Sequence, residues 1–414
     1  MRNYNHLRIL TLVLAGGKGE RLYPLTKFRT KPAVPFGGKY RIVDFVLSNL
    51  TNSGFLSIYV LTQYKAQSLT EHIEQGWQLG SALRRRNFFI TIAPAQMWLG
   101  EEWYKGTADA VFQNLHLLSN YDPDIVLVFA ADHVYKMDIS QMLTFHLERD
   151  ADFTVSGIPI TTQDPSKYGI ICADENNRVC GFWEKPKALP ERTENKKLFI
   201  SMGNYIFKRE FLEEILIEDS KDENSSHDFG KDILPKVYKN SRVYVYDFYT
   251  NKIKGEEKPY WKDVGTIKEY FEANMDILKN PPVLNLWNPY WTIGTVSFKD
   301  PPCFIERGAS INNSIISEGT RIEKGAKITN SVIGRNCIIG QDAIVEDSII
   351  HYGVKIKDKA RVIKCIVDKF VTVEKGIDLR EKFEENYHLV DEVLIIPSPP
   401  PIIRIKSEFV FGSS

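Results

Sequence analysis

The sequence predicts an α/β domain with a Rossmann-like, mostly parallel sheet, followed by a left-handed parallel β-helix of hexapeptide repeats. In the first part of the chain, short apolar runs alternate with longer segments of helical spacing, which is typical of a parallel sheet covered by helices. From about Ile305 onwards, β-branched residues recur close to every sixth position, which indicates a parallel β-helix. The apolar runs are Leu10–Ala15, Ser57–Thr62, Ile125–Ala130 and Asp152–Ile160.

A change in composition near residue 280 predicts where the first domain ends. Prolines at positions 281, 282 and 289 interrupt regular structure, as a linker does. We therefore expect the α/β domain over residues 1–280, a linker over 281–299, and the β-helix with a C-terminal tail over 300–414. Every third repeat site lies 16 to 18 residues after the previous one, which is one turn of a three-sided coil. These sites are Ile305, Ile322, Ile338, Ile356 and Val373.

Composition excludes several classes of partner. Lys plus Arg and Asp plus Glu both number 53 in the 414 residues, so no global field attracts nucleic acid or a membrane surface. No apolar run approaches the roughly 18 residues that span a bilayer. The five cysteines form no C-x-x-C pair, which indicates reduced thiols in a cytoplasm, and we expect them to be buried packing residues. They are Cys172, Cys180, Cys303, Cys337 and Cys365.

The first apolar run ends in a glycine-rich turn that is followed by clustered cations. Glycines allow positive φ and remove the Cβ atoms that would keep an anion away from the backbone amides. Two familiar phosphate loops fail by spacing, because no Ser or Thr follows Lys18 and because Leu22 stands where a dinucleotide fingerprint needs a small residue. A tight turn is the alternative, but the cations favour an anion site. The glycines are Gly16, Gly17 and Gly19, and the cations include Arg21, Lys27, Arg29 and Lys31.

Other polar positions allow two interpretations each when taken alone. Asp132 follows a fully apolar run and is either a structural cap or a metal-binding carboxylate. Thr107 or Asp109 is a candidate N-cap for a helix containing residues 110–118. The adjacent Glu184 and Lys185 are, before context, a solvated surface pair. Asp263 precedes a helix expected to begin near residue 266, and caps are common there.

Several motifs together resemble the sugar-phosphate nucleotidyltransferases, and within them the bacterial ADP-glucose pyrophosphorylases (glucose-1-phosphate adenylyltransferases). The matching segments are AGGKGERL and TKPAVPFGGKYRIVDFVLSN in the first part of the chain, then WYKGTADA, ADH, EKP, NSSHDFGKDILP and YWKDVGT. Ala131 stands where many relatives have Gly before the aspartate. The resemblance implies adenylyl transfer from ATP to glucose 1-phosphate, the first committed step of glycogen or α-glucan synthesis, with Mg²⁺ as cofactor.

The resemblance also implies a role for each matching residue. Arg21 and Lys31 neutralise the departing pyrophosphate, and Asp132 and Asp263 bind Mg²⁺; these four form the implied catalytic set. The residues implied at ATP are Gly16, Gly17, Gly19, Gln96, Gly106 and Thr107. The residues implied at glucose 1-phosphate are Tyr104, Gly169, Glu184, Lys185 and Ser201. NSSHDFGKDILP is assigned to the fold and to shaping the pocket, with Ser226 and Asp228 as helix caps.

Members of this family are typically homotetramers controlled by metabolite effectors, so the resemblance implies both properties here. Lys27, Arg29 and Arg41 form a candidate regulatory anion site. Phe28 stands where the enteric members carry a lysine that takes part in activator binding, which weakens the case for fructose 1,6-bisphosphate.

Three other functions stay open from the sequence. One is a nucleotidyltransferase of the same family that uses UTP, dTTP or GTP. Another is a non-catalytic regulatory subunit of the family, although the implied catalytic residues and Lys185 are all retained. The third is an acyltransferase that uses the β-helix, where His351 is the only histidine in the repeats.

Overall fold

The computed structural model describes residues 6–80, 87–96, 103–160, 164–189, 196–382 and 384–399. These residues form two compact units, Met1–Lys299 and Asp300–Ser414, which are described separately. Most of the C-terminal proline-rich tail lies outside the described residues. None of the helices among the described residues has the length and apolar character needed to cross a membrane.

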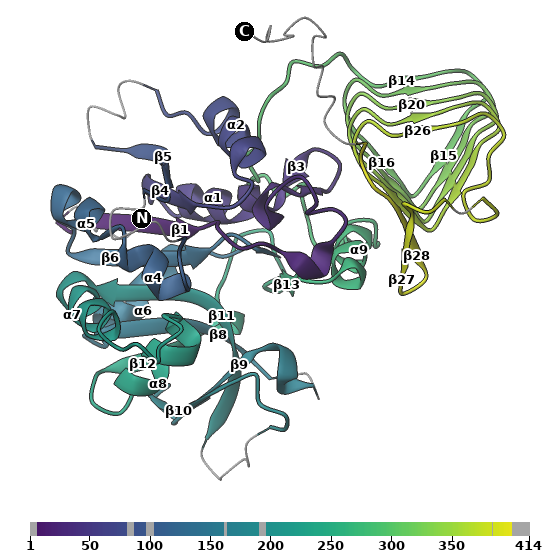
Figure 1. Cartoon of the computed structure of the whole chain (residues 1–414). Helices are drawn as coiled ribbons and strands as arrows, with labels where there is room; N and C mark the ends of the chain where they lie inside the picture. Colours follow the sequence, from purple (N-terminus) through teal and green to yellow (C-terminus); the bar gives the residue numbers. More distant parts are fainter. Residues whose placement is uncertain are drawn as a thin grey trace, which may run out of the picture. The chain divides into compact units, whose positions relative to one another are not determined.

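The first unit is built on a nine-stranded sheet in the order β10-β9-β11-β6-β1-β4-β5, with β8 pairing to β11 and β12 (Figure 1). All four predicted apolar runs are strands of this sheet, which confirms the predicted fold class. The strands β1, β4, β5 and β6 run parallel, whereas β11 is antiparallel to β6. Their bounds are β1 Ile9–Leu14, β4 Ser57–Thr62, β5 Phe89–Pro94, β6 Ile125–Ala130, β8 Phe153–Pro159, β9 Gly169–Ala173, β10 Val179–Glu184, β11 Lys197–Lys208 and β12 Val243–Asp247.

Both faces of this sheet are buried, which explains why its strands are continuous apolar runs. Leu12 and Val128 face one core, and their neighbours Val13 and Phe129 face the other. Helices α1, α2 and α6 cover the second face, and α4, α5, α7 and α8 cover the first. Their bounds are α1 Ile42–Asn52, α2 Gln67–Gly76, α4 Thr107–Phe112, α5 Leu115–Tyr121, α6 Ile139–Glu148, α7 Arg209–Asp219, α8 Leu234–Val237 and α9 Ile267–Met275.

Shorter elements connect the strands to the loops around them. Strand β2 pairs with β3, and β7 pairs with β13, in two small separate sheets. Their bounds are β2 Pro35–Phe36, β3 Tyr40–Arg41, β7 His133–Tyr135 and β13 Trp261–Asp263. Single helical turns of 3-10 type lie at Glu20–Leu22, Lys31–Ala33, Pro165–Lys167 and Phe248–Thr250, and a π-helical turn lies at Phe229–Ile233.

The single helix expected over residues 110–118 is wrong, because the chain forms α4 and α5 with a break at Asn114. The Asn114 amide donates to Ala110 O at 2.8 Å and to the Tyr104 hydroxyl at 2.9 Å. Neither Thr107 nor Asp109 is the N-cap, since α4 follows Gly106 and has no side-chain cap. Instead, the amides of Ala108 and Asp109 donate to the carbonyl of His227. A distant loop therefore satisfies this helix terminus.

The helix predicted to begin near Thr266 does so, and one of the two caps predicted before the π-helical turn is confirmed. Thr266 caps α9, accepting from the Glu269 amide at 3.2 Å, and Glu269 reaches back to the Thr266 amide at 3.1 Å. This reciprocal pair is a capping box. Asp228 caps the turn that follows it by accepting from the amides of Gly230 and Lys231. The hydroxyl of Ser226 instead donates to Asp232, so Ser226 is not the cap.

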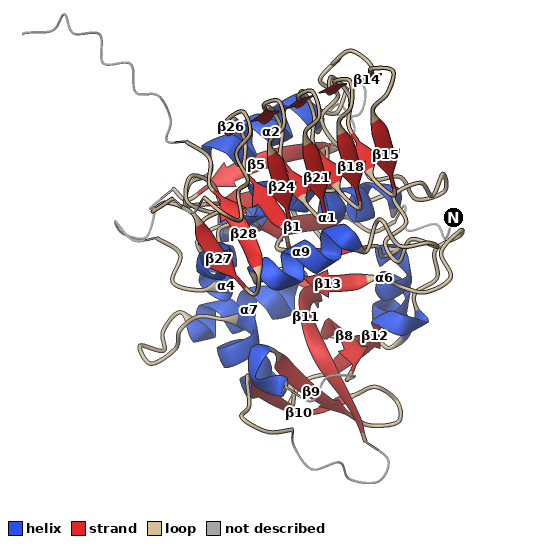
Figure 2. Ribbon diagram, turned by 90° about the vertical axis from the view of Figure 1, so that its right-hand side faces the viewer, coloured by secondary structure: helices blue, strands red, loops and turns tan. Residues whose placement is uncertain are grey.

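The second unit is a parallel β-helix whose coils stack through three sheets. Figure 2 shows β15, β18, β21 and β24 side by side as one of them. The first sheet contains β14 Phe304–Ile305, β17 Arg321–Ile322, β20 Ile338–Ile339, β23 Lys355–Ile356 and β26 Thr372–Val373. The second contains β15 Ser310–Asn312, β18 Lys327–Thr329, β21 Ile344–Glu346 and β24 Arg361–Ile363. The third contains β16 Ile315–Ile316, β19 Val332–Ile333, β22 Ile349–Ile350, β25 Cys365–Val367, β28 Val393–Ile396 and β27 His388–Val390.

One of the predicted repeat sites, Ile338, is wrong, because Ile339 takes its place in the stacked row. Ile339 pairs with Ile322 on one side and Ile356 on the other, and it is fully buried. Ile338 points outward and is 37% exposed. The coil length is therefore 17 residues throughout this row, because stacked residues must share one register to fill the interior.

Candidate active site

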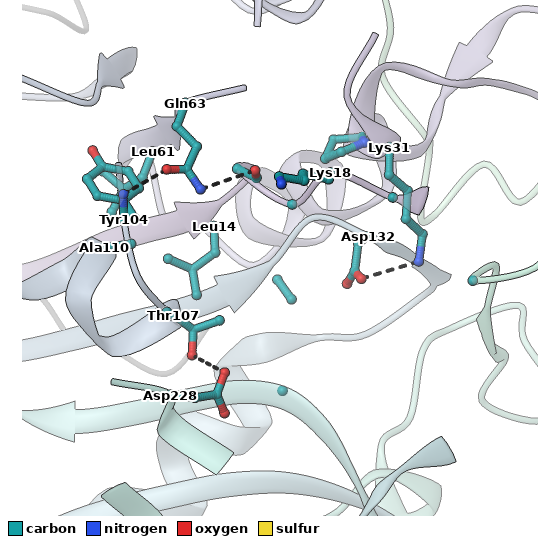
Figure 3. A pocket seen from close by; sticks show the side chains of 18 of the residues that line it. Leu14, Lys18, Lys31, Leu61, Gln63, Tyr104, Thr107, Ala110, Asp132 and Asp228 are labelled. Atoms are coloured by element: carbon teal, nitrogen blue, oxygen red, sulfur yellow. Dashed lines mark hydrogen bonds and ion pairs between the residues drawn. The ribbon is translucent and has the colours of Figure 1, made fainter. Parts of the chain in front are cut away.

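A cavity of about 650 Å³ opens at the carboxyl ends of the central parallel strands. Leu14 of β1, Leu61 of β4 and Ala130 of β6 line it, each at or near the end of its strand. Loops after parallel strands meet at this edge, which is where open α/β sheets bind ligands. Figure 3 shows the side chains that point into the cavity.

The glycine-rich turn after β1 forms one wall of the cavity. Gly16, Gly17 and Gly19 all line it. Gly19 has φ of +66°, and a Cβ there would lie 2.8 Å from the Cβ of Lys31, so this position requires glycine. A Cβ on Gly17 would meet nothing within 4 Å. The hydroxyl of Thr30 donates to Gly17 O at 3.1 Å and to Ala15 O at 3.3 Å, which holds the turn from behind.

Lys31 joins the two predicted metal carboxylates. Its Nζ lies 3.2 Å from Asp132 Oδ2 (Figure 3). The same Nζ lies 3.2 Å from Asp263 Oδ1. Asp132 follows β6, and Asp263 ends β13. The two carboxylates are brought together because β13 pairs antiparallel with β7, with Asp263 opposite His133. The Asp132 side chain is 54% exposed, whereas that of Lys31 is only 6% exposed.

The opposite charges of Lys31 and of the carboxylates of Asp132 and Asp263 stabilise one another. Burial by itself would lower the pKa of Lys31, but the carboxylates of Asp132 and Asp263 outweigh burial and raise it. The surrounding walls partly desolvate the Asp132 carboxyl, which opposes its ionisation, but the Lys31 ammonium outweighs this effect and lowers its pKa. Burial lowers the pKa of His133, and Trp261 Nε1 donates to His133 Nδ1 at 2.6 Å. His133 is therefore a neutral imidazole with its proton on Nε2.

Arg21 reaches the same end of the cavity. A Cβ on Gly265 would lie 2.9 Å from Asp263 Oδ2 and 3.0 Å from Arg21 Nη2. The guanidinium of Arg21 and the carboxylate of Asp263 therefore lie against Gly265, which leaves no space for a side chain there. Arg21, Lys31, Asp132 and Gly265 all line the cavity, so the structure brings together the predicted catalytic set.

Gln63 is a cavity residue that the sequence did not single out. Its Oε1 accepts from the Tyr104 amide at 2.9 Å, and its Nε2 donates to Gly16 O at 3.4 Å (Figure 3). It therefore connects the glycine turn to the segment that carries Tyr104, Gly106 and Thr107, which also line the cavity. A polar residue directly after strand β4 was the available signal.

Gly106 and Thr107 lie against the loop before the π-helical turn. A Cβ on Gly106 would lie 2.2 Å from His227 O, so only glycine fits. Thr107 donates to Asp228 Oδ2 at 2.9 Å and accepts from the Phe229 amide at 3.0 Å. Asp228 lines the cavity as well, so this loop contributes a carboxylate to the wall in addition to its caps.

The residues implied at glucose 1-phosphate lie on strands β9, β10 and β11. Gly169 begins β9 and is the register partner of Glu184, which ends β10. Gly169, Glu184 and Ser201 are not among the residues that line the cavity, whereas Tyr205 of β11 is. Burial raises the pKa of Tyr205, as do the nearby carboxylates of Asp228 and Glu184, while a hydrogen bond with Ser201 lowers it. These side chains therefore gather around Tyr205 at one side of the cavity.

Lys185 lies at the end of the β9–β10 hairpin in a strained backbone conformation. Its φ is +45°, which is uncommon for a residue with a side chain. Its Nζ lies 3.0 Å from Glu184 Oε1, and its side chain is 60% exposed. The Tyr168 carbonyl accepts from the Lys185 amide, and the Tyr168 ring lies against Trp261 of β13, the strand that ends in Asp263. Burial raises the pKa of Tyr168 to about 12, with further contributions from the carboxylates of Asp263 and Glu269.

The remaining candidates lie elsewhere. Gln96 is exposed and donates to Pro94 O at 3.1 Å, and it is not among the residues that line the cavity.

The three cations predicted to form a regulatory anion site differ in environment. Lys27 is exposed and lies over the Phe28 ring, whereas Arg29 is only 3% exposed. Arg41 begins the turn into α1 and donates to Ser68 Oγ at 2.9 Å.

The fold and this cavity define a class of protein: an α/β enzyme whose cavity lies between a glycine-rich turn and a lysine that joins two carboxylates. The sequence profile of the Nucleotidyl transferase family matches residues 10–280, and that of the EIF2B subunit epsilon LbH domain, a left-handed β-helix, matches residues 295–390. The chain belongs to the nucleotidyl transferase family. Within that family its relatives are glucose-1-phosphate adenylyltransferases.

Three of these relatives illustrate the extent of the similarity. The protein named Glucose-1-phosphate adenylyltransferase from Thermodesulfovibrio yellowstonii is 49% identical over 76% of this chain and 77% of its own length. The protein of the same name from Photobacterium profundum is 45% identical over 94% of this chain and 98% of its own length. The protein of the same name from Deinococcus radiodurans is 42% identical over 94% of this chain and 98% of its own length. The similarity therefore covers both units.

Proposed function

We propose that this protein transfers the adenylyl group of ATP to α-D-glucose 1-phosphate, releasing ADP-glucose and pyrophosphate. One observation carries the proposal: the glycine turn, Arg21, Lys31 and Asp132 line a single cavity, and Lys31 also contacts Asp263 beside it. A Cβ on Gly230 would lie 3.3 Å from both Asp228 Oδ1 and Glu184 Oε2, so the hairpin that ends in Glu184 and Lys185 lies beside the carboxylate that Asp228 adds to the cavity wall. The names of the relatives specify the same reaction.

The reaction needs no protein nucleophile. A phosphate oxygen of glucose 1-phosphate attacks the α-phosphorus of ATP in line, and the bond from that phosphorus to the bridging oxygen of the leaving pyrophosphate breaks. The enzyme's contribution is to position the two substrates and to stabilise the charge that develops. In this scheme the turn at Gly16, Gly17 and Gly19 holds the triphosphate, and Arg21 and Lys31 stabilise the leaving pyrophosphate.

In the proposed complex, glucose 1-phosphate binds beside the β9–β10 hairpin. Lys185 binds the phosphate of glucose 1-phosphate, while Glu184 accepts hydrogen bonds from glucose hydroxyls. Tyr104, Gly169 and Ser201 contact the same ligand in the proposed complex. Gln96, Gly106 and Thr107 are the remaining proposed contacts of ATP, with Gln96 at the adenine. Gln96 reaches this ligand only if its segment approaches the cavity when ATP binds, since its amide contacts Pro94 O.

Asp132 and Asp263 fit the requirements of Mg²⁺. They provide two hard oxygen ligands from separate elements, and the exposed Asp132 carboxylate faces the cavity. No group of three or more His, Cys, Asp or Glu side chains among the described residues has the arrangement of an all-protein metal site. Mg²⁺ commonly binds through one or two carboxylates and substrate phosphates, so this donor set suits it. When bound, the ion would neutralise charge on the phosphates.

Gly17→Ala is expected to raise the KM for ATP about tenfold, which corresponds to roughly 1.4 kcal/mol. The added methyl group meets no protein atom within 4 Å, so it occupies space beside the bound triphosphate without disturbing the fold. Steady-state kinetics and a thermal unfolding scan measure the two effects. Gly80→Ala is the matched control, because its Cβ also meets nothing within 4 Å and it does not line the cavity. An unchanged KM for ATP in Gly17→Ala would exclude close approach of the triphosphate here.

A nucleotide panel tests the proposed function. The purified full-length protein is supplied with Mg²⁺, glucose 1-phosphate and either ATP, UTP, dTTP or GTP, and released pyrophosphate is measured. We expect rapid turnover with ATP and far slower turnover with the other three. Preference for another nucleotide would reassign the substrate within the family. No turnover with any of them would favour a non-catalytic subunit or an acyl-transfer function for the β-helix.

Further properties of the family extend this proposal. A homotetramer, control by metabolite effectors, a cytoplasmic location and a role in glycogen or α-glucan synthesis are all proposed by resemblance. Lys27 is the most accessible member of the proposed regulatory anion site, since Arg29 is buried and Arg41 contacts Ser68. Activity measured with sugar phosphates, phosphoglycerate, pyruvate, AMP and phosphate tests this proposal.

A further inference from the structure

Two thiols face each other across the β9–β10 hairpin. Cys172 Sγ and Cys180 Sγ are 3.3 Å apart. In the antiparallel ladder, Cys172 lies opposite Gly181, and the register shifts between Val179 and Gly181. Cys180 is therefore the extra residue of a β-bulge, and a bulge redirects a side chain relative to the regular alternation of a strand.

The two cysteines differ in access to solvent. Cys172 is only 6% exposed, whereas Cys180 is exposed, contrary to the prediction that every cysteine is a buried packing residue. Strand β10 is at the edge of the sheet, so no further strand among the described residues covers its bulged residue on the outer side. Burial and the adjacent Cys180 together raise the pKa of the Cys172 thiol to about 11. Cys180 is therefore the thiol that meets a reagent first.

The geometry suits a disulfide. Cys180 adjoins Gly181, the residue opposite Cys172, and the bulge turns its side chain so that the two sulfurs are 3.3 Å apart. A disulfide is about 2.05 Å long, so the sulfurs have only a short distance to move. Small rotations of the two side chains are enough to close the remaining gap, so the strands need not separate.

We propose that Cys172 and Cys180 are a reversible oxidation site that forms a disulfide across the β9–β10 hairpin. The oxidant is a low-molecular-weight disulfide of the glutathione class. The Cys180 thiolate attacks that disulfide, which forms a mixed disulfide on Cys180 and releases one thiol. The Cys172 thiolate then attacks the Cys180 sulfur, which forms the protein disulfide and releases the second thiol. The protein loses two protons and two electrons, and the small disulfide is reduced to two thiols.

The disulfide has a consequence for substrate binding that rests on the proposed function. The pair Cys172–Gly181 belongs to the same ladder as Gly169–Glu184, with only two residue pairs between them. A covalent bond at the bulge fixes the two strands to each other shortly before Glu184 and Lys185, so it restricts how these two residues adjust to a bound ligand. We expect oxidation to raise the KM for glucose 1-phosphate severalfold and to leave the KM for ATP unchanged, because the glycine turn belongs to another part of the sheet.

Peptide mapping tests the disulfide itself without any activity measurement. The full-length protein is equilibrated with oxidised glutathione, quenched with an alkylating reagent, digested and analysed by mass spectrometry. We expect a linked peptide containing both Cys172 and Cys180, and its loss after treatment with dithiothreitol. Cys180→Ser should abolish the linked peptide, whereas Cys303→Ser should preserve it, since Cys303 is a partly exposed thiol in the other unit.

Other results of the same experiment would overturn the proposal. A glutathione adduct that persists on Cys180, with Cys172 still free, would show that the second exchange step does not occur. A disulfide between Cys180 and Cys303 would assign the oxidation to a different pair. If the linked peptide forms and the KM for glucose 1-phosphate does not change, the proposal that the disulfide weakens glucose 1-phosphate binding is wrong. Absence of adenylyl transfer in the reduced protein would refute the proposed function and leave the mapping result intact.

Discussion

Asp132→Asn is expected to lower kcat about 100- to 1000-fold, the typical loss when one preorganised charge contact at a reacting centre is removed. The substitution keeps the size of the side chain but removes its charge and replaces one of its two acceptor oxygens by a donor. Asp132 is more than half exposed to the cavity, so its carboxylate contributes little to packing. The effect should therefore fall on catalysis, and the folded structure should survive.

The measurement compares kcat at saturating ATP, glucose 1-phosphate and Mg²⁺, together with the melting temperature. Asp391→Asn is the matched control, because Asp391 is exposed in the turn between β27 and β28 of the other unit. Its φ of +46° is also one that asparagine tolerates. We expect the control to retain full activity. A kcat near the unaltered value for Asp132→Asn would refute its assignment as a metal carboxylate.

Lys31→Met is expected to lower kcat about 100- to 1000-fold and yet to tighten the binding of Mn²⁺ when no nucleotide is present. Lys31 Nζ lies 3.2 Å from an oxygen of each carboxylate, so the ammonium occupies the position between them that suits a cation. A divalent ion must compete with this charge. Methionine fills a similar volume without charge, so it removes the competition together with the support of the leaving group.

Two readouts separate these effects. Electron paramagnetic resonance measures free Mn²⁺ during a titration of the protein without nucleotide, and steady-state assays give kcat. We also expect Lys31→Met to melt at a lower temperature than the unaltered protein until Mn²⁺ is added, because two adjacent carboxylates lose their shared counter-ion. Lys262→Met is the control, since its Nζ contacts Glu272 at 3.0 Å instead of the carboxylate pair. Unchanged or weaker Mn²⁺ binding in Lys31→Met would show that Lys31 does not compete.

The strands and the β-helix could be predicted because their signals are dense and local. Strands β4 and β6 coincide with predicted apolar runs, since a strand buried on both faces has no polar residue to interrupt it. The β-helix repeats the same signal in every coil. The register of the β-helix was harder to predict, because Ile338 and Ile339 are both β-branched and either one fits a period near six. Stacking against Ile322 and Ile356 decides between them.

Helix ends could be predicted only where the capping group is close in the chain. Thr266 and Glu269 cap each other across one turn, and the sequence placed the start of α9 near Thr266. The start of α4 depends instead on the carbonyl of His227. The break before α5 depends on a hydrogen bond between Asn114 and the Tyr104 hydroxyl. No local pattern contains either partner.

The sequence by itself determined the two kinds of domain, the glycine turn at the end of the first strand and the candidates Arg21, Lys31, Asp132 and Asp263. The domains and the glycine turn depend on residue type and short spacing, whereas the roles of the four candidates follow from the resemblance of their motifs to the family. Only the tertiary structure decided that Lys31 lies between the two carboxylates and that Gln63 connects Gly16 to Tyr104. It also brought Cys172 and Cys180 into contact through a bulge. The reason is that such contacts arise from strand pairing and packing, which neighbouring residues in the sequence do not specify.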